Sequence, residues 1–546
     1  MLDSSQCDIT RLPLAMTGFA DLRNRGKIYV DKTALIAEIA KHDNPLFLSR
    51  PRRFGKSLLI DTLESLFSRG LEDFKGLAID GKWNDKTYSI VRFDFSVLAD
   101  NSPREFEKAL RNRLLRKFDV QNKNTYLDSL GEYRQIEEIA EIIFDKLHDN
   151  STVLLIDEYD APLTHHLDKP DELQETMRIL NKFYAVIKEY TKKFRFIFIT
   201  GITRTSHISI FSAFNNLIDI SFEKEFNTLL GFTQDEIIQY FDQYLTNSAK
   251  IFGVKKEYIY TVLKKYYDGF VFSFDSDKTL YNPWSVLNFL ERPNNGFKNY
   301  WYQSGGTPSL IMQYFKVKDD FDFLNYKNRE KYFNLNQLQC KYEITNIPTE
   351  ILLYQAGYFT AIKETNNIAK LITPNEEVEE SLLDLYFTAN NITMSLNVEY
   401  GIDKIIDDID AKNIKSLVKT FNAILNDGVS SNSNIFDDER SVRDIIYTAI
   451  HRSINLEKSK ERETVKGRSD LELITRKTHM VIEFKRTYPK ENNSRISYRD
   501  AKSSLAEAIA QIKKHHYGET PFTSQKRFCV AMVISTEIGR ASCRER

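Results

Sequence analysis

Two groups of residues that lie far apart in the chain have the types and spacing needed to bind a nucleotide. One group is Gly55, Lys56 and Ser57, and the other is the acidic pair Asp157 and Glu158. Phosphate binding uses backbone N–H groups at a helix N-terminus, a lysine for the β- and γ-phosphates, and a hydroxyl for magnesium. The first group supplies these three features in order, so the sequence predicts a phosphate-binding loop for ATP.

The segment before the lysine departs from a complete phosphate-binding motif. Such a motif has a glycine five positions before Gly55, whereas this chain has Arg50 there, followed by Pro51. We therefore expect a loop entrance that is stiffer and more cationic than usual, with Arg53 and Phe54 completing the contacts to the cofactor. A bare Gly-Lys-Ser tripeptide is most often an ordinary surface feature, but here it follows an apolar strand and opens a helix, which favours the nucleotide interpretation.

The acidic pair follows an apolar run, residues 153–156, which is typical of a buried parallel strand. Asp157 is predicted to hold Mg2+ directly or through water, together with Ser57, and Glu158 to polarise the attacking water. The alternative is a helix N-terminus with acidic residues in its first turn, which fits a fully apolar preceding strand less well.

Thr200 and Arg204, which follow the apolar run 194–199, are further candidates for contact with the nucleotide. Thr200 could sense the γ-phosphate. Arg204 could stabilise charge there or form a surface ion pair, and the sequence leaves these two roles equally open. The predicted residues follow the carboxyl ends of strands, where ligands gather in parallel sheets, so we expect them to face one crevice.

A second constellation lies near the other end of the chain. Glu483 and Lys485 are two positions apart on an expected strand, so both face the same side, and Asp470 begins the strand before it. The polar segment 475–479 lets these strands pair as a hairpin. Two carboxylates that hold Mg2+ beside a basic group are what phosphodiester hydrolysis needs. The alternative is an exposed cross-strand charge pattern, which the spacing alone slightly favours.

The elements that must position these residues follow from the apolar periodicity. Apolar or alternating runs predict strands at 45–49, 91–95, 153–156 and 194–199. Helical spacing predicts helices from Lys56 to Gly70 and at 106–120, 136–147 and 173–190. This alternation implies a parallel α/β sheet. A second α/β pattern closes the chain, with a helix at 439–454, strands at 471–475 and 480–485, a helix at 501–516 and a strand at 527–535.

Several motifs, in order along the chain, are similar to those of the AAA-ATPase-like family found widely in bacteria. They are Tyr29-Val30-Asp31-Lys32-Thr33, Arg50-Pro51-Arg52-Arg53-Phe54-Gly55-Lys56-Ser57, Leu155-Ile156-Asp157-Glu158-Tyr159-Asp160, Thr200-Gly201-Ile202, Phe211-Ser212-Ala213-Phe214-Asn215-Asn216-Leu217, Tyr281-Asn282-Pro283-Trp284-Ser285 and Pro374-Asn375-Glu376-Glu377-Val378. The resemblance implies that arginine at the first loop position is normal for the family. It also implies that a nuclease domain of the PD-(D/E)XK superfamily follows the ATPase-like region.

The C-terminal residues resemble that superfamily's motif. The resemblance rests on the segment from Glu463 to Leu471, with Ser469 where many members have proline, and on Glu483-Phe484-Lys485. It implies that Asp470, Glu483 and Lys485 form the nuclease site. It also implies weaker correspondences for Glu439, in the place of a helical carboxylate, and for Gln511 and Tyr517 near the helix after the core.

The chain is therefore expected to contain four regions and a tail. We predict a P-loop NTPase-like domain at 1–225, a helical lid at 226–321, a mixed connecting region at 322–427 and an α/β restriction-endonuclease-like domain at 428–537. Thr233 followed by Glu236 indicates a helix start in the lid, and the polar segment 428–434 indicates a linker. Residues 538–546 resemble the translation of a common DNA-sequencing adaptor, so we expect the natural chain to end near Glu537.

Composition excludes several classes of protein. Hydrophobic residues make up 42% of the 546 residues and charged residues 28%, which is typical of globular chains. Basic and acidic residues number 76 and 77, so no net field drives binding to nucleic acid or membrane. We expect no export signal and no membrane span. The 4 cysteines lack Cys-x-x-Cys spacing, which indicates reduced thiols and a cytoplasmic location.

These observations predict one function and leave one alternative. We predict an ATP-binding AAA-like ATPase module that regulates a Mg2+-dependent nuclease, with nucleic acid as partner and DNA favoured over RNA. A local excess of Lys and Arg over Asp and Glu from 431 to 537 agrees with contacts to phosphate. The alternative is a nucleotide-dependent switch or scaffold that binds a protein partner, or forms a homo-oligomer, with a degenerate nuclease domain.

Overall fold

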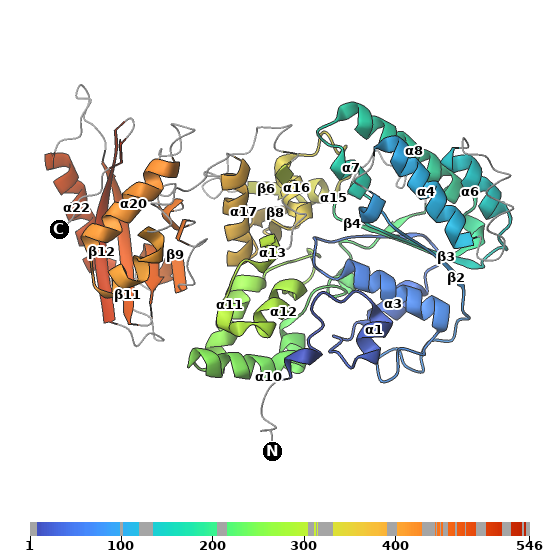
Figure 1. The fold of residues 1–546 in the computed structure, drawn as a ribbon, viewed down its shortest axis with the longest axis horizontal. Helices are drawn as coiled ribbons and strands as arrows, with labels where there is room; N and C mark the ends of the chain where they lie inside the picture. Colours follow the sequence, from blue (N-terminus) through green and yellow to red (C-terminus); the bar gives the residue numbers. More distant parts are fainter. Residues whose placement is uncertain are drawn as a thin grey trace, which may run out of the picture. The chain divides into compact units, whose positions relative to one another are not determined.

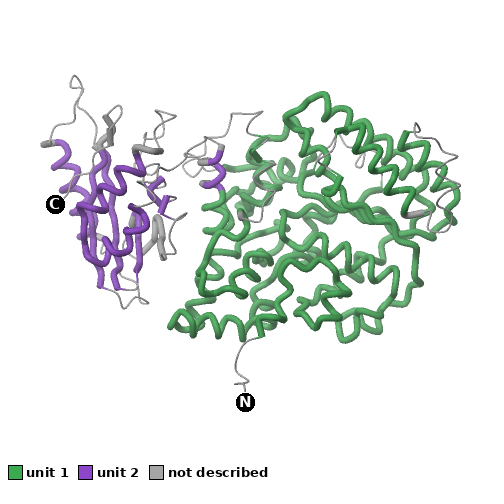
Figure 2. The backbone as a smooth tube through the Cα atoms, viewed as in Figure 1, with its two compact units in different colours: residues 1–321, 330–381 green, residues 322–329, 382–546 purple. Residues whose placement is uncertain are grey.

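A computed structural model describes residues 8–98, 102–118, 135–204, 216–303, 331–389, 401–428, 457–464, 467–475, 477–487, 498–515 and 526–537, with short pieces at 311–312, 314, 443, 445–447, 449–450 and 540–541 (Figure 1). The chain divides into two compact units (Figure 2). Unit 1 contains residues 1–321 and 330–381, and unit 2 contains residues 322–329 and 382–546.

Unit 1 is built on a five-stranded parallel sheet with the spatial order β2-β3-β4-β1-β5. The strands are β1 (Leu46–Ser49), β2 (Ser89–Asp94), β3 (Thr152–Asp157), β4 (Phe194–Gly201) and β5 (Ile218–Asp219). Leu48 of β1 pairs with Thr200 of β4, and Ile156 of β3 pairs with Ile199. The carboxyl ends of β1, β4 and β3 therefore lie side by side.

Helices cover both faces of this sheet, which explains why every residue of β3 is buried. Figure 1 shows α1 and α3 on one side and α4, α6 and α8 on the other. The helices around the sheet are α1 (Phe19–Asn24), α2 (Thr33–Ala40), α3 (Lys56–Arg69), α4 (Pro103–Phe118), α6 (Ile136–Asp145), α7 (Ala161–His165) and α8 (Pro170–Glu189). The predicted parallel α/β sheet is confirmed.

The region predicted to be a lid contains helices with an aromatic core. It contains α10 (Gln234–Phe252), α11 (Lys256–Tyr267), α12 (Pro283–Glu291) and α13 (Tyr300–Gln303). Thr233 and Glu236 form the predicted capping box at the start of α10. The core of the lid includes Phe241, Tyr267 and Phe289, and it extends to Leu12 and Val30 of the N-terminal segment. The lid therefore packs on the start of the chain.

A small antiparallel sheet with the order β6-β8-β7 follows in unit 1. Its strands are β6 (Lys331–Asn334), β7 (Thr360–Lys363) and β8 (Ile368–Ile372), accompanied by α15 (Leu335–Gln339), α16 (Thr349–Ala356) and α17 (Glu376–Ala389). Gly357 has φ of 90°, and a Cβ on it would lie 2.7 Å from Pro51 Cβ. This region therefore contacts the phosphate loop closely enough to require a glycine.

Unit 2 contains a five-stranded mixed sheet with the order β13-β12-β11-β10-β9. Its strands are β9 (Glu457–Thr464), β10 (Gly467–Ile474), β11 (Thr478–Thr487), β12 (Lys526–Glu537) and β13 (Arg540–Ala541). Its helices include α19 (Ile405–Asp410), α20 (Ile414–Gly428) and α22 (Tyr498–His515), and α22 packs on β11 and β12. The β10–β11 hairpin is antiparallel, whereas β11 and β12 are parallel.

Several details of unit 2 differ from the sequence-based expectations. Strand β9 was not predicted, because its sequence, Glu-Lys-Ser-Lys-Glu-Arg-Glu-Thr, has no apolar residue and so no apolar alternation. Unit 2 also includes α19 and α20, which precede the predicted start of the nuclease-like region at 428. Most of the predicted helix at 439–454 and of the predicted linker lies outside the described residues. In the suspected tail, Arg540 and Ala541 pair with β12.

Short 3-10 helices occur at Ile9–Arg11, Ser96–Leu98, Thr191–Lys193, Lys224–Phe226 and Pro293–Asn295. Among the helices that the structure describes, none combines the length and apolar character needed to cross a membrane. Cys340 and Cys529 are free thiols. The other two cysteines, Cys7 and Cys543, lie outside the described residues.

Candidate functional site

The phosphate loop joins the end of β1 to the start of α3. Gly55, the residue before the helix, has φ of 101°, which is in the left-handed region that favours glycine. The helix begins at Lys56, so the N–H groups of its first turn have no acceptor within the helix and carry partial positive charge. This is the geometry that binds phosphate groups.

Lys56 folds back over the loop. Its Nζ donates hydrogen bonds to the carbonyl oxygens of Arg50 at 2.9 Å and Pro51 at 3.0 Å, and only 6% of the residue is exposed. Burial lowers the pKa of its ammonium group, and the negative charges of Glu158 and Asp157 partly offset this effect. Lys56 therefore ties the two ends of the loop together and places its charge at the helix N-terminus.

The side chain of Arg50 turns away from the loop and is 2% exposed. Its guanidinium donates to the carbonyl oxygens of Ser49 at 2.9 Å, Ser221 at 2.7 Å and Phe226 at 3.2 Å, and it lies 4.3 Å from the ring centroid of Phe272. Burial lowers its pKa to about 9. The expectation that Arg50 makes the loop entrance more cationic is wrong, because all three acceptors hold its charge away from the loop.

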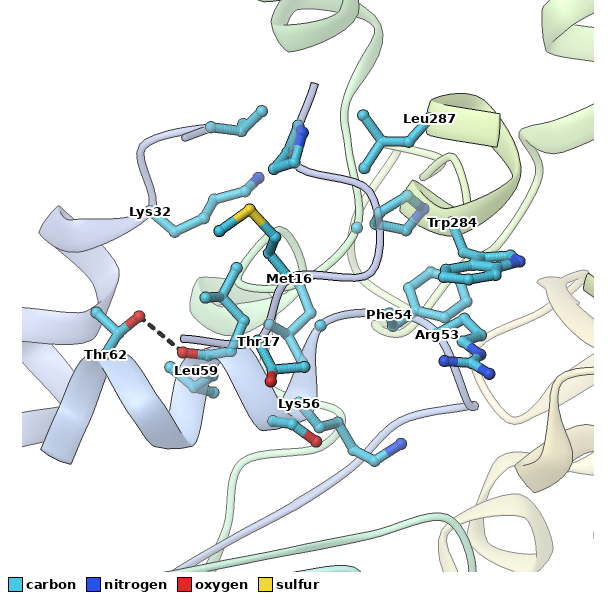
Figure 3. A pocket seen from close by; sticks show the side chains of 18 of the residues that line it. Met16, Thr17, Lys32, Arg53, Phe54, Lys56, Leu59, Thr62, Trp284 and Leu287 are labelled. Atoms are coloured by element: carbon cyan, nitrogen blue, oxygen red, sulfur yellow. Dashed lines mark hydrogen bonds between the residues drawn. The ribbon is translucent and has the colours of Figure 1, made fainter. Parts of the chain in front are cut away.

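A cavity of about 470 Å³ lies beside the loop, a volume within the range of small-molecule sites (Figure 3). Four parts of unit 1 line it: the N-terminal segment, the phosphate loop with α3, the segments that follow β2 and β3, and the lid. The lining residues include Met16, Lys32, Arg52, Arg53, Phe54, Gly55, Lys56, Ser57, Glu158, Trp284 and Leu287. Most of the predicted nucleotide contacts therefore surround a single cavity.

Trp284 brings the lid into contact with the phosphate loop. The Arg53 guanidinium carbon lies 4.3 Å from the centroid of the Trp284 ring, and Figure 3 shows the two groups stacked at one end of the cavity. Arg53 has φ of 67°, which is strained for a residue with a side chain. Its neighbour Phe54 packs edge-on against Phe270, with 4.8 Å between ring centroids. The loop and the lid thus share one wall.

Asp157 and Thr200 meet at the ends of β3 and β4. Thr200 Oγ1 donates a hydrogen bond to Asp157 Oδ1 at 2.5 Å, and both residues are buried. Neither lines the cavity, whereas the next residue, Glu158, does. Burial raises the pKa of Glu158, and the positive charges of Lys56 and Arg52 partly offset this effect. A carboxylate with a raised pKa is suited to accept a proton from water near neutral pH.

Asp160, the last acidic residue of the motif 155–160, makes hydrogen bonds that stabilise the fold. Asp160 Oδ2 accepts hydrogen bonds from the backbone N–H of Thr203 at 2.7 Å and from its hydroxyl at 2.6 Å. Asp160 stands at the N-cap of α7 but does not cap it with its side chain. A Cβ on Gly201 would lie 2.4 Å from Tyr159 Cδ1, so the strand end needs glycine here. Asp160 and Gly201 therefore have structural roles that account for their presence in the motifs 155–160 and 200–202 without any ligand.

Arg204 is not among the residues that line the cavity. Its Nε donates to Asp219 Oδ2 at 3.0 Å, its backbone N–H donates to Gln355 Oε1 at 2.9 Å, and its guanidinium carbon lies 4.7 Å from the ring centroid of Phe222. The residue is buried. Of the two roles that the sequence left open, the structure shows an ion pair, which is buried rather than at the surface.

In unit 2, the structure brings Asp470, Glu483 and Lys485 together. The β10–β11 ladder reaches the pair Leu471–Ile482, and beyond it Asp470 Oδ2 accepts a hydrogen bond from the backbone N–H of Phe484 at 2.8 Å. Glu483 is 1% exposed, and its Oε1 lies 3.5 Å from Lys485 Nζ. Two carboxylates and an ammonium group therefore occupy one end of the hairpin.

A buried pair that the sequence did not suggest lies farther along the same hairpin. Glu472 Oε2 and His479 Nε2 are 2.9 Å apart, and both residues are at most 1% exposed. Glu472 is two residues from Asp470, and so it lies on the same face of β10. No apolar or metal-ligand spacing in the sequence distinguishes these two residues from ordinary strand positions.

The donor groups of unit 2 fit magnesium. Mg2+ is usually held by one or two carboxylates and keeps several water molecules, and Asp470 and Glu483 offer two. Within the parts of the chain that the structure describes, no group of three or more His, Cys, Asp or Glu is arranged to hold a metal ion. Glu439 and Tyr517 lie outside those parts, and Gln511 lies on α22. In unit 1, the Ser57 hydroxyl on the cavity wall is the corresponding oxygen donor.

Comparison with known proteins identifies two regions of the chain. A family model described as "Predicted AAA-ATPase" matches residues 13–211, and a second, described as "PD-(D/E)XK nuclease superfamily", matches residues 437–541. The chain joins an AAA-ATPase-like domain to a PD-(D/E)XK superfamily domain. An "Uncharacterized protein in vnfD 5'region" of Azotobacter chroococcum mcd 1 is 28% identical over 382 residues, which cover 68% of this chain and 69% of that protein. No solved structure matches the chain.

The AAA-ATPase-like match includes the phosphate loop and Glu158 but ends before the lid. The sequence does not mark the lid residues Trp284 and Leu287 as cavity residues, although Trp284 belongs to a motif that supported the resemblance. Lys32 and Met16 also line the cavity without having been predicted. Lys32 lies in another such motif, whereas Met16 has no signal in the sequence. The PD-(D/E)XK match contains all three predicted nuclease residues.

Proposed function

We propose that this protein is an ATP-binding AAA-like ATPase module that regulates a Mg2+-dependent PD-(D/E)XK nuclease acting on DNA. One observation supports this most strongly. Lys56, Ser57 and Glu158 surround a cavity of nucleotide size in a chain whose other unit brings Asp470 and Glu483 together. A binding site for a phosphate compound and a site for phosphodiester chemistry thus occur in one polypeptide.

In the proposed nucleotide site, the chain's own residues bind and orient the phosphates. The first-turn N–H groups of α3 and the Lys56 ammonium group would bind the β- and γ-phosphates, and Arg53 would remain close to them. Ser57 would hold Mg2+, with Asp157 acting directly or through water, and bound Mg2+ would neutralise phosphate charge. Glu158 would accept a proton from the attacking water, for which its raised pKa is suited.

In the proposed nuclease site, Asp470 and Glu483 would hold Mg2+. The bound ion would polarise the phosphodiester and lower the pKa of the attacking water. The backbone N–H of Phe484 fixes the Asp470 carboxylate, and Lys485 places a positive charge 3.5 Å from Glu483. Lys485 would thus orient the water and stabilise charge on the phosphate. We place this activity in the cytoplasm, which the free thiols of Cys340 and Cys529 support.

The test uses the purified full chain in two assays. Calorimetry with ATP and Mg2+ should show binding that Lys56→Ala weakens, because the lysine carries the charge at the loop. Cleavage of single- and double-stranded DNA and RNA should require Mg2+ and be lost in both Asp470→Ala and Lys485→Ala. DNA should be cut in preference to RNA. Equal cleavage by wild type and both variants would refute the nuclease assignment, and absence of ATP binding would refute the nucleotide assignment.

A further inference from the structure

Glu377 is a fully buried carboxyl group in the first turn of α17. Its Oε1 accepts a hydrogen bond from the backbone N–H of Trp301 at 2.9 Å. Burial raises the pKa of Glu377 to about 8, and the Ser285 hydroxyl and the N–H groups of Trp301 and Tyr300 partly offset this effect. At neutral pH this side chain is therefore mostly an uncharged acid held by the turn that begins α13.

That turn also holds Trp284 in the wall of the cavity. The Trp284 Nε1 donates a hydrogen bond to the carbonyl oxygen of Tyr300 at 3.2 Å. The same indole ring lies 4.3 Å from the Arg53 guanidinium carbon (Figure 3). A continuous set of contacts thus runs from Glu377, through the backbone at Tyr300 and Trp301, to Trp284 and the phosphate loop.

The first turns of α17 have further bonds to the same region. Ser381 Oγ donates to Asn299 Oδ1 at 2.9 Å, and Asn375 Nδ2 donates to the carbonyl oxygen of Asp268 at 2.6 Å. Residues of α17 up to Ser381 belong to unit 1, and those from Leu382 onward belong to unit 2. The helix that Glu377 anchors is therefore continuous with the chain of the nuclease unit.

We propose that Glu377 is a positioning residue for the nucleotide pocket, that it holds Trp284 against Arg53 through the Tyr300–Trp301 turn, and that bound nucleotide acts on α17 through these contacts. This inference rests on the proposed function, since it takes the cavity to be the ATP site. Coupling between two sites is reciprocal. An anchored α17 therefore favours nucleotide binding, and nucleotide favours an anchored α17.

The first test compares Glu377→Ala with the matched variant Glu377→Gln. Glutamine has the shape of the uncharged acid and keeps an oxygen that can accept from Trp301 N–H, whereas alanine leaves that N–H without its buried acceptor. Glu377→Ala should raise the Kd for ATP about tenfold, and Glu377→Gln should stay within about twofold of wild type. Ile139→Ala, which removes a buried side chain of α6 outside both the lid core and the cavity wall, controls for general destabilisation and should also stay within about twofold.

A double-mutant cycle separates positioning from a merely structural role. If Glu377 acts through Trp284, Glu377→Ala should cause no further loss of ATP affinity in a Trp284→Ala background. Additive losses, or a folded Glu377→Ala protein that binds ATP as wild type does, would overturn the inference. Failure of wild type to bind ATP would instead overturn the proposed function, so the two failures are distinguishable.

The second test measures the coupling to unit 2. The ratio of cleavage rates with and without ATP is determined for wild type, Glu377→Gln and Glu377→Ala, each at an ATP concentration that saturates that variant. The ratio should be unchanged in Glu377→Gln and should approach one in Glu377→Ala. An unchanged ratio in Glu377→Ala at saturating ATP would show that α17 does not transmit the signal through this residue.

Discussion

Replacing Arg50 tests whether this residue fastens the phosphate loop or contacts phosphate. Its guanidinium donates to three backbone carbonyl oxygens and stacks on Phe272, and it does not line the cavity. Arg50→Ala removes all of these contacts at once. Arg50→Lys keeps a positive charge but loses the planar fork that reaches acceptors in several directions.

The size of the effect follows from opposing contributions. Three hydrogen bonds contribute about 1 kcal/mol each, and a desolvated cation–π contact adds about 2 kcal/mol. The cost of burying the charge offsets part of this stabilisation, and the same cost lowers the pKa of Arg50 to about 9. Truncation also leaves buried acceptors without their donor. The net loss in the free energy of unfolding of unit 1 should be about 2–4 kcal/mol for Arg50→Ala and about half that for Arg50→Lys.

Tryptophan fluorescence during denaturant unfolding measures this loss for unit 1 alone, because all 3 tryptophans, Trp83, Trp284 and Trp301, belong to that unit. Calorimetry under folding conditions then compares ATP with ADP. The ratio of the two Kd values should change by less than about twofold in Arg50→Ala, since a residue outside the cavity has no preference for the γ-phosphate. A stability loss below about 1 kcal/mol, or a selective tenfold loss of affinity for ATP, would contradict a structural role for Arg50.

Three further predictions follow from individual contacts. Gly201→Ala should lower the Tm of unit 1 by about 5 °C or more, because its Cβ would lie 2.4 Å from Tyr159; Gly18→Ala, whose nearest neighbour atom would be 3.6 Å away, is the control. Glu377→Gln should gain stability relative to wild type as pH rises from 4.5 to about 8. Burial raises the pKa of Glu377, so its contribution to stability is fully present below the unfolded-state pKa of 4.5 and is lost as the pH rises to the folded-state pKa of about 8. Parallel pH profiles of stability for the two proteins would contradict this. Asp470→Asn should lower the cleavage rate by about a hundredfold or more while leaving the Kd for ATP within about twofold, and residual cleavage near the wild-type rate would exclude Asp470 as a ligand.

Much of the fold could be predicted because the strands of the large sheet are marked by local sequence. The run that forms β3 is apolar throughout, and Gly55 with Lys56 marks the start of α3. In unit 2, the spacing of Glu483 and Lys485 predicted one face of β11. These features depend on side-chain periodicity over a few residues, which the sequence displays directly.

Other features depend on contacts between distant segments. The direction of the Arg50 side chain is set by carbonyl oxygens of Ser221 and Phe226, about 170 residues farther along, which no local pattern reveals. Trp284 likewise enters the cavity wall only because α12 packs beside the phosphate loop. Strand β9 has a charged sequence, and it pairs because β10 offers a free edge. The identities of these residues are clear from the sequence, but the distant residues that they contact could not be predicted from it.

We propose that a nucleotide bound in unit 1 controls cleavage in unit 2. The most direct test is the rate of Mg2+-dependent DNA cleavage with and without ATP, measured side by side for wild type and Lys56→Ala. Lys56 belongs to unit 1, whereas Asp470, Glu483 and Lys485 belong to unit 2, so the substitution leaves the nuclease residues in place. We expect ATP to change the wild-type rate at least about threefold and Lys56→Ala to abolish this response. The same response to ATP in both proteins would contradict it.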